Sequence, residues 1–435
     1  MFGYYLDLAW HSLKRSPVLT ALMVLAIGLG IGASMTMITV LHVMSGDPLP
    51  ERSSTIYAPH LNPLPLDFHQ NPYAPDPAAS FTWPDAMALL KAHRAEHQAV
   101  MAGGQLLVRP DQAGLHPFYA NGRFTTNEFF SMFGVPMLRG GGWSAADDDT
   151  LVRSVVLAET LSRRLFGTID SVGRSVSLGN TTFRVIGVAR DWQPRPLFYA
   201  DTTAKVFSDS DLFFLPLSTS IDLKFGSNGN ESSWGGSSID MKSSTMSWLQ
   251  VWVQLRNVSQ ASAYRQFLMD YSAQQKSLGH FQRSPEEATL TPLIVWLKQR
   301  NLVPSDVRMQ LWLALGFLLV CMINIAALLL AKFLRRSGEV SVRRALGAKR
   351  RDIFFQLGIE SALIGVAGGV LGLLITQLGL LSVRHRSDDY AKLAQMDTPM
   401  LLATLLLAIV ASVLAGLIPA WHTCRVAPAL QLTTQ

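Results

Sequence analysis

Residues that could do chemistry are scattered along this chain of 435 residues. His93 and His97 stand four apart in a segment that we expect to be helical, where two imidazoles could share one face and begin a metal site. No third ligand lies near them in the sequence, so a solvated helix face is the better interpretation. Residues 147–149 are aspartates without the alternating spacing of an EF-hand calcium loop, and we expect them to form a solvated turn.

Motifs that usually mark catalysis are missing. The sequence has no G-x-x-x-x-G-K-[ST] phosphate loop, no H-E-x-x-H zinc motif, no paired C-x-x-C and no G-x-S-x-G nucleophile motif. We therefore expect no catalytic residue, no metal ligand, no bound cofactor and no enzymatic activity in this chain.

The densest cluster of charge lies between Lys332 and Asp352, where eight Lys and Arg residues stand against two acids. If residues 339–352 form one helix, four arginines fall on a face about 100° wide and apolar side chains fall opposite. The arginines are Arg343, Arg344, Arg350 and Arg351, and the apolar residues are Val342, Ala345, Leu346 and Ile353. Such a helix could offer guanidinium groups to an acidic partner, although a positive-inside anchor that only sets topology explains the charges equally well.

Four long apolar runs must position this segment. They lie at residues 18–44, 309–331, 359–383 and 399–421. Each reaches the roughly 20 residues that a helix needs to cross ~30 Å of hydrocarbon. Charged residues make up 16% of the chain and hydrophobic residues 49%, whereas soluble domains have about 25% charged residues. We expect a membrane protein with four transmembrane α-helices, one N-terminal and three C-terminal, and a large extracytoplasmic α+β domain between the first and the second.

Basic residues next to the spans predict the orientation. Lys14 and Arg15 precede the first span, and many of the other basic residues near spans lie in the segment 332–358. The positive-inside rule then gives cytoplasmic segments at 1–17, 332–358 and 422–435, an extracytoplasmic domain at 45–308 and a short outer loop at 384–398. The same distribution accounts for the formal charge of +6 without nucleic acid as a partner.

The N-terminal segment 1–17 allows two interpretations. Its apolar and aromatic residues are spaced as in a short amphipathic helix that would lie on the inner membrane surface. It could equally be the start of a longer first helix that is interrupted at Pro17. The run 18–44 exceeds the apolar core of about 7 to 15 residues in a signal peptide, so we expect it to be retained.

The extracytoplasmic segment divides by composition. The composition of residues 47–77 predicts an extended, irregular segment that leads away from the membrane. The Ser-, Gly- and Asn-rich stretch 224–247 predicts a long surface loop. β-Branched residues and glycine punctuation predict strands at 105–109, 154–158, 175–178, 183–188 and 248–255. Helical spacing predicts helices at 81–97, 127–133, 159–166 and 261–277. The segment is long enough for two packed subdomains of roughly 100–200 residues each.

Polar residues and glycines inside the spans predict how the helices meet. Glu360 could reach the interface or pair with a basic residue of the preceding loop, and proton coupling is the weaker alternative. Asn324 and Gln377 are expected to form hydrogen bonds between helices. Three G-x-x-x-G pairs predict close helix packing, unless Gly is simply common in membrane helices. The pairs are Gly28 with Gly32, Gly365 with Gly369, and Gly368 with Gly372.

The basic segment reads Glu339-Val-Ser-Val-Arg-Arg-Ala-Leu-Gly-Ala-Lys-Arg-Arg-Asp352. It resembles the E-[IV]-G-[IV]-R-R-A-L-G-A-[ST]-[RK]-[RK]-D-I signature of the MacB/FtsX-type ABC transporter permeases. The likeness continues into the glycine-rich third span, and residues 129–136 and 425–430 also look like parts of that family. Ser341 and Lys349 depart from the signature.

The resemblance implies a MacB-like periplasmic core domain joined to an FtsX-like permease domain in the bacterial inner membrane, with both termini in the cytoplasm. Such permeases act as two copies, identical or related, with ABC ATPase subunits that bind ATP and Mg. Carried over onto this chain, the ATPase contact involves Glu339, Arg343, Arg344, Leu346, Gly347, Arg350, Arg351 and Asp352. Membrane lipid, a periplasmic adaptor and an outer-membrane channel are further partners that the resemblance allows.

The function that the resemblance implies is export. ATP hydrolysis by a separate ATPase would move the periplasmic domains, and with them a peptide, antibiotic or lipid-like substrate. An FtsX-like permease that transmits a signal to a cell-wall or sensory partner, and a lipoprotein-release permease, share the same plan and stay open as alternatives. The outer segment is larger than regulatory members tend to have, which favours export.

Overall fold

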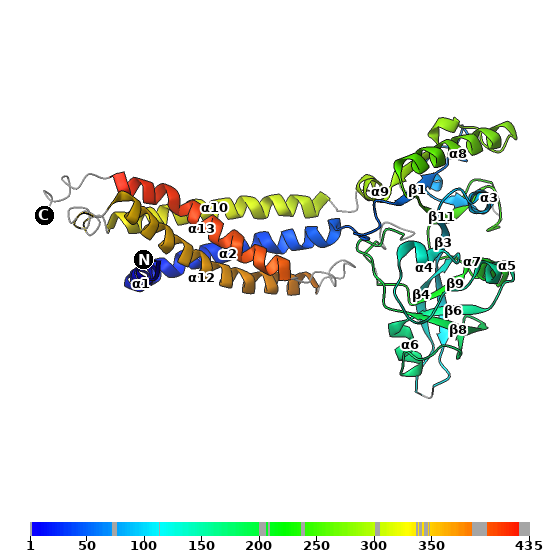
Figure 1. The fold of residues 1–435 in the computed structure, drawn as a ribbon, viewed down its shortest axis with the longest axis horizontal. Coiled ribbons are helices and arrows are strands. Elements are labelled where there is room, and N and C mark those ends of the chain that lie inside the picture. The colour runs from blue at the N-terminus through cyan, green and yellow to red at the C-terminus, as the bar shows by residue number, and fades with distance from the viewer. Residues whose placement is uncertain are drawn as a thin grey trace. The chain divides into compact units, whose positions relative to one another are not determined.

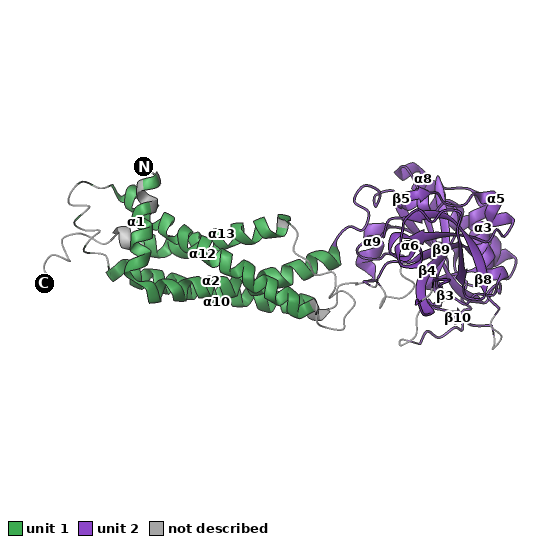
Figure 2. Ribbon diagram, turned by 90° about the horizontal axis from the view of Figure 1, so that it is seen from below, with its two compact units in different colours: residues 1–45, 303–435 green, residues 46–302 purple. Residues whose placement is uncertain are grey.

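The computed structural model describes residues 2–71, 76–112, 114–199, 206–207, 209–235, 240–300, 305–335, 338, 342, 347, 349–384 and 398–425. The chain divides into two compact units (Figure 2). Residues 1–45 and 303–435 form the first, which we call the helical unit. Residues 46–302 form the second, which we call the inserted domain because it interrupts the helical unit in sequence.

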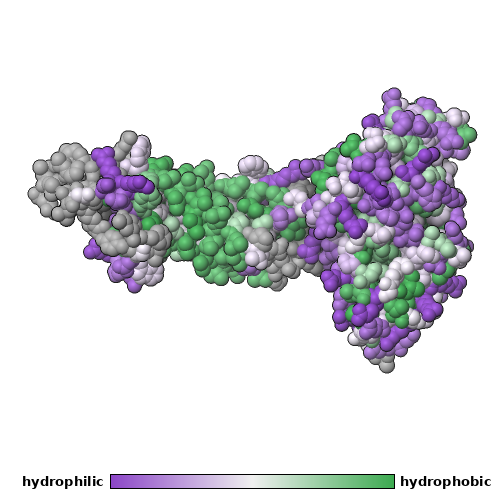
Figure 3. All heavy atoms as spheres, in the orientation of Figure 1, coloured by the Kyte–Doolittle hydropathy of each residue, from purple (hydrophilic) through white to green (hydrophobic). Residues whose placement is uncertain are grey.

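The helical unit consists of helices that run alongside one another (Figure 1). Its described helices are α1 (Phe2–Arg15), α2 (Pro17–Ser45), α10 (Ser305–Arg335), α12 (Arg350–Arg384) and α13 (Thr398–Arg425). All but α1 are long and apolar enough to cross a membrane, and hydrophobic residues cover most of their visible surface (Figure 3). Each of these four contains one predicted span, so the predicted plan of one N-terminal and three C-terminal helices is confirmed.

A break at Ser16 separates α1 from α2. Pro17 takes the first position of α2, where its missing N–H loses no helical hydrogen bond and its fixed φ suits the helix. In α1 the side chain of Trp10 is 53% exposed whereas Ala9 is buried. The segment is therefore a helix of its own with one buried face.

Glycines let α2 and α12 approach each other closely. A Cβ atom built at Gly32 would lie 2.5 Å from Cγ2 of Ile375, and one built at Gly368 would lie 2.4 Å from a side chain of α2. At Gly28 and Gly372 the nearest atoms would lie at 2.8 and 3.1 Å. Real Cβ contacts are longer, so any larger residue at these positions would push the two helices apart.

The other predicted glycine pair lies between α12 and α13. A Cβ atom at Gly365 would lie 2.1 Å from the hydroxyl of Ser412, and one at Gly369 would lie 3.0 Å from Cβ of Ala408. Between α2 and α10, the hydroxyl of Ser34 donates a hydrogen bond of 3.1 Å to a carbonyl of α10. α12 is therefore packed closely on two sides, and its neighbour α2 is tied to α10.

The inserted domain is built on one path of paired strands. Its described strands are β1 (Ile56–His60), β2 (Phe81–Thr82), β3 (His97–Arg109), β4 (Phe118–Thr125), β5 (Met137–Gly140), β6 (Ser154–Ala158), β7 (Ser175–Leu178), β8 (Thr181–Ala189), β9 (Phe213–Pro216), β10 (Ser232–Ser233), β11 (Met246–Gln254) and β12 (Thr289–Pro292). They pair in the order β12-β1-β11-β3-β4-β9-β6-β8-β5, with β2 and β10 on β11 and β7 on β3 and β8. The pairs β4/β9 and β6/β8 are parallel.

Short helices connect these strands. They are α3 (Trp83–Ala92), α4 (Phe129–Phe133), α5 (Ala145–Asp149), α6 (Glu159–Phe166), α7 (Leu217–Asp222), α8 (Val258–Ser277) and α9 (Leu293–Gln299). The first half of β3 pairs with β11 and its second half with β4. One apolar core extends from Trp248 and Leu268 to Val155 and Val185. The strands on both sides of β3 therefore share one core, and residues 46–302 form a single compact unit.

Several predicted boundaries are wrong. The helix predicted at 81–97 ends at Ala92, because His93 adopts a left-handed conformation with a φ of 47° at the helix C-cap. His97 begins β3, so the two histidines do not share a helix face. Residues 47–77, which were expected to be irregular, contain β1.

The stretch 224–247 is held against the sheet at its described positions. Ser232 in β10 pairs with Ser247 of β11, and Ser227 forms a bridge to Gly104 of β3. Ser247 itself is buried in β11. The predicted surface loop is therefore anchored at both of these points.

Residues 145–149 form the short helix α5 instead of the predicted solvated turn. Ser144 caps the helix through reciprocal hydrogen bonds with Asp147. The half-buried carboxylate of Asp148 accepts a hydrogen bond of 2.9 Å from the N–H of Asn127. Burial raises the pKa of Asp148 to about 6, because desolvation of the charged form outweighs this hydrogen bond.

The tight contact of α2 with α12 predicts a cost for Gly32→Ala. Overpacking of a close contact destabilises by about 1–3 kcal/mol, so the melting temperature of the detergent-solubilised chain should fall. Gly316→Ala in α10 is the matched control, since a Cβ there meets nothing within 4 Å and alanine favours a helix. Equal melting temperatures for the two variants, measured by circular dichroism, would contradict the packing described above.

The raised pKa of Asp148 predicts a pH-dependent stability. An unfolded Asp has a pKa of about 3.9, so the folded chain gains stability as the pH falls from about 6 to about 4. Asp148→Asn lacks this gain, and its melting temperature minus that of the wild type should be more positive at about pH 7.5 than at about pH 4.5, by a few °C. The exposed neighbour Asp149→Asn is the control. If both variants give the same pH profile, Asp148 is not the titrating group.

Candidate functional site

The candidate site is the basic segment between α10 and α12, together with the helix ends that hold it. Of the residues that the resemblance assigns to ATPase contact, Glu339, Arg343, Arg344 and Leu346 lie outside the described residues. The structure describes Gly347, Arg350, Arg351 and Asp352.

The prediction of one continuous helix over residues 339–352 is wrong. Gly347 has a φ of 104°, a backbone conformation that a right-handed helix cannot contain. α12 begins after this interruption, at Arg350. One continuous helix therefore does not extend from residues before Gly347 to Arg350 and Arg351. The spacing of apolar residues does not reveal such a break, because it carries no information on the φ angle of a single glycine.

Arg350 and Arg351 form the exposed start of α12. The guanidinium of Arg351 lies 5.3 Å from the ring centroid of Phe355, while Ile353 is buried against the helical unit. Positive charges at a helix N-terminus oppose the helix dipole by about 0.3–1 kcal/mol each, and Asp352 in the first turn offsets only part of this. The two arginines are locally unfavourable for α12, which is typical of residues kept for a partner or for membrane orientation.

A buried ion pair lies where α10 meets α12. Nζ of Lys332, near the end of α10, lies 2.6 Å from Oε1 of Glu360 in α12. Lys332 is 3% exposed and Glu360 is 0% exposed. The hydroxyl of Ser12 in α1 donates a hydrogen bond of 2.6 Å to the same carboxylate oxygen. Glu360 thus pairs with a basic residue at the start of the preceding loop, one of the arrangements that the sequence allowed.

Sequence reasoning singled out Glu360 but missed its partners. A carboxylate in an apolar run signals that a cation must pair with it or that a polar group must donate a hydrogen bond to it. Lys332 is one of eight basic residues in its segment, and Ser12 carries no signal of its own. Only the packing of α1 against α12 brings Ser12 to Glu360.

The two other polar residues that the sequence analysis singled out in the spans lie on the surface of the helical unit. Asn324 in α10 and Gln377 in α12 are both exposed. For Asn324, the described part of the chain shows no hydrogen bond to a neighbouring helix. Neither residue lines the ion pair of Lys332 and Glu360.

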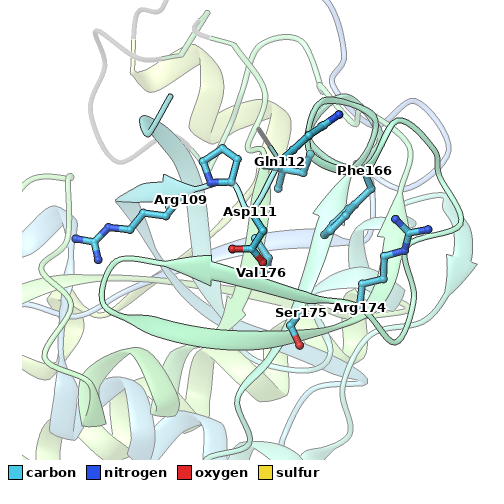
Figure 4. Close-up of a pocket in the computed structure, with 9 residues that line it drawn as sticks. Arg109, Asp111, Gln112, Phe166, Arg174, Ser175 and Val176 are labelled. Carbon is cyan, nitrogen blue, oxygen red and sulfur yellow. The ribbon is translucent and has the colours of Figure 1, made fainter. Parts of the chain in front are cut away.

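The inserted domain contains a pocket of about 300 Å³ between residues 109–112, 165–166 and 174–176. In Figure 4 the side chains of Arg109 and Arg174 extend away from each other, and Asp111 lies between them. The two guanidinium groups therefore do not point to a common position where they could bind one anion. Among the described residues no group of three His, Cys, Asp or Glu is placed to hold a metal ion.

Family models match most of the chain. Residues 20–268 match the MacB-like periplasmic core domain, and residues 312–428 match the FtsX-like permease C-terminal domain. The first model spans α2 and most of the inserted domain, and the second spans α10, α12 and α13.

Curated relatives agree with these matches. The pyoverdine export ATP-binding/permease protein PvdT of Pseudomonas syringae pv. tomato is 24% identical over 98% of this chain and 59% of its own length. PvdT of Pseudomonas entomophila is 25% identical over 83% of this chain and 50% of its own length. The macrolide export ATP-binding/permease protein MacB of a Shewanella species is 22% identical over 69% of this chain and 41% of its own length. The chain thus spans about half the length of these relatives.

A solved structure resembles part of the chain at low similarity. The periplasmic region of MacB from Actinobacillus actinomycetemcomitans covers 58% of this chain and 94% of its own, with 16% identity and a TM-score of 0.37. The two domain matches, in their order along the chain, assign the family, and the second of them includes the basic segment. This chain belongs to the MacB/FtsX-type family of ABC transporter permeases.

Proposed function

We propose that this permease couples ATP hydrolysis by separate ABC ATPase subunits to movement of the inserted domain, and that the movement serves export. The basic segment and the start of α12 contact the ATPase on the cytoplasmic side, where both termini also lie. The inserted domain lies in the periplasm. ATP and Mg are bound by the ATPase, and a second permease copy, identical or related, completes the transporter.

One observation carries the proposal. α12 continues without interruption from the exposed Arg350 to Arg384, and it packs against α2 at glycine positions that leave no room for a side chain. A force applied to Arg350 and Arg351 would therefore move α12 as a rigid rod and displace α2 with it. α2 ends at Ser45, next to the first residue of the inserted domain.

The inserted domain is built to receive such a displacement. Shortly after α2, Nη1 of Arg52 donates a hydrogen bond of 2.6 Å to the carbonyl of Ser131 in α4. Shortly before α10, the ring of Trp296 in α9 packs at 5.1 Å against that of Trp252 in β11. The first and last segments of the domain are thus fixed to its body at Arg52 and Trp296, and we infer that a displacement that reaches them passes on to the sheet.

The names of the relatives favour export over the alternatives. PvdT and MacB are named for pyoverdine export and macrolide export. We infer a peptide, antibiotic or lipid-like substrate that is handled outside the membrane, with a periplasmic adaptor and an outer-membrane channel as further partners. If the chain and its ATPase do not export such a substrate, signal transmission to a cell-wall or sensory partner and lipoprotein release become the favoured functions.

Reversing the charge at the start of α12 tests the ATPase contact. Arg350→Glu combined with Arg351→Glu should lower the amount of ATPase that copurifies with the chain by about tenfold, because attraction becomes repulsion at two adjacent positions. Acidic residues suit a helix N-terminus, so α12 itself should not weaken.

The matched control reverses two exposed basic residues of α8, with Arg265→Glu and Lys276→Glu. It makes the same change in net charge on the inserted domain. If the α12 variant retains as much ATPase as this control, the proposed contact is wrong.

Distance measurements test whether the inserted domain moves. A nitroxide at Val258→Cys, which is 78% exposed at the start of α8, reports the separation of the two permease copies. The native cysteines are first removed as Cys321→Ala and Cys424→Ala. In nanodiscs with the ATPase, the distance distribution by pulsed electron paramagnetic resonance should shift between the nucleotide-free state and the state trapped with ATP and vanadate. An unchanged distribution in a complex that hydrolyses ATP would refute mechanical coupling.

A further inference from the structure

We propose that Ser12, Lys332 and Glu360 form an anchor that ties α1 and both ends of the basic segment into one body. The anchor positions the basic segment, so that a push from the ATPase moves α1, α10 and α12 together. This inference rests on the proposed function for the source of the force. The three residues are positioning residues, because they act through the segment that they hold.

The three side chains of the anchor meet at one point. A single carboxylate oxygen, Oε1 of Glu360, lies 2.6 Å from Nζ of Lys332 and accepts the hydroxyl proton of Ser12 at 2.6 Å. All three residues are 3% exposed or less. Three helices that are distant in sequence therefore meet at one atom.

Buried apolar residues lie near the ion pair along both helices. Leu329 and Phe333 flank Lys332 on α10, and Leu357 and Ile364 flank Glu360 on α12, all of them buried in one cluster. Charges in such surroundings attract each other more strongly than at a surface, and salt screens them little. The ion pair therefore holds its geometry under conditions in which exposed pairs loosen.

The position of the pair in the sequence gives it a mechanical role. Lys332 precedes residues 339–352 and Glu360 follows them, so their contact joins the end of α10 to the first part of α12. Arg350 and Arg351 form the exposed start of the same helix α12. A force on the two arginines is then shared by α10 and α12. Ser12 adds α1 to the same body.

Stability alone does not explain a buried ion pair. Replacing such a pair with apolar residues of similar size is often neutral or stabilising, whereas removing one partner is strongly destabilising. An ion pair does hold its partners to one register, because any sliding of α10 along α12 separates the charges. The experiment uses this difference between a stabilising and a positioning role.

The first part of the test measures the tie of α1 without any ATPase. Hydrogen exchange is followed in the full chain in lipid nanodiscs. Ser12→Ala removes a hydrogen bond to a charged group, so the α1 amides should exchange roughly tenfold faster or more. Ser16→Ala is the matched control, because the Ser16 hydroxyl is buried without a hydrogen-bond partner among the described residues. Equal exchange of α1 in both variants would overturn the tie.

The second part separates positioning from stability. Lys332→Met should lower the melting temperature, and the double variant with Lys332→Met and Glu360→Met should restore it. The double variant should still bind the ATPase, yet lose most of the nucleotide-dependent shift of the nitroxide at Val258→Cys. The exchanged pair, Lys332→Glu with Glu360→Lys, should regain most of that shift. A double Met variant that shifts like the wild type would overturn the anchor as a positioning device.

The outcomes distinguish this inference from the proposed function. If the wild-type chain shows no nucleotide-dependent shift, the proposed function fails and the force-sharing role of the anchor fails with it. The exchange measurement judges the tie between α1 and α12 independently, because it needs neither ATPase nor nucleotide. A wild-type shift that survives loss of the ion pair contradicts the anchor alone.

Discussion

The helical unit depends on close fit between α12 and its neighbours. Apolar side chains gain nothing by moving from lipid to another helix, so membrane helices hold together through van der Waals contact and a few hydrogen bonds. Glycines of both helices line the contact of α2 with α12, and Gly365 brings α13 equally near. Because Ile and Leu side chains of one helix lie directly on glycines of the other, we infer that α12 does not move alone. The coupling proposed for this permease needs that constraint.

The two units of this multi-pass inner-membrane protein place polar groups by opposite rules. The helical unit shows apolar residues outside and keeps Glu360 and Lys332 within, where each neutralises the other. The inserted domain has a mostly hydrophilic surface around an apolar core. It also buries an ion pair, Arg123 with Asp211 at 3.1 Å. In each of these two pairs, the partner of the buried charge comes from a distant part of the chain.

Elements with a strong local pattern could be predicted, and those that depend on distant partners could not. The strand at 154–158 and the helix at 159–166 match β6 and α6. β4 and β9 were missed. β4 contains Gly122, which looks like a strand breaker, but a Cβ there would lie 2.5 Å from the ring of Phe213 in β9. The glycine makes room for an aromatic ring of another strand, and no local pattern predicts that.

The sequence by itself determined the family, the four apolar helices and the place of the inserted domain, because length, hydropathy and a contiguous motif are local properties. It also marked Glu360 as a charge that needed a partner. Only the tertiary structure decided that Lys332 and Ser12 are the partners, and that Gly347 ends the helix expected across the basic segment. Contacts between residues far apart in the chain, and the φ angle of a single glycine, depend on how the helices pack.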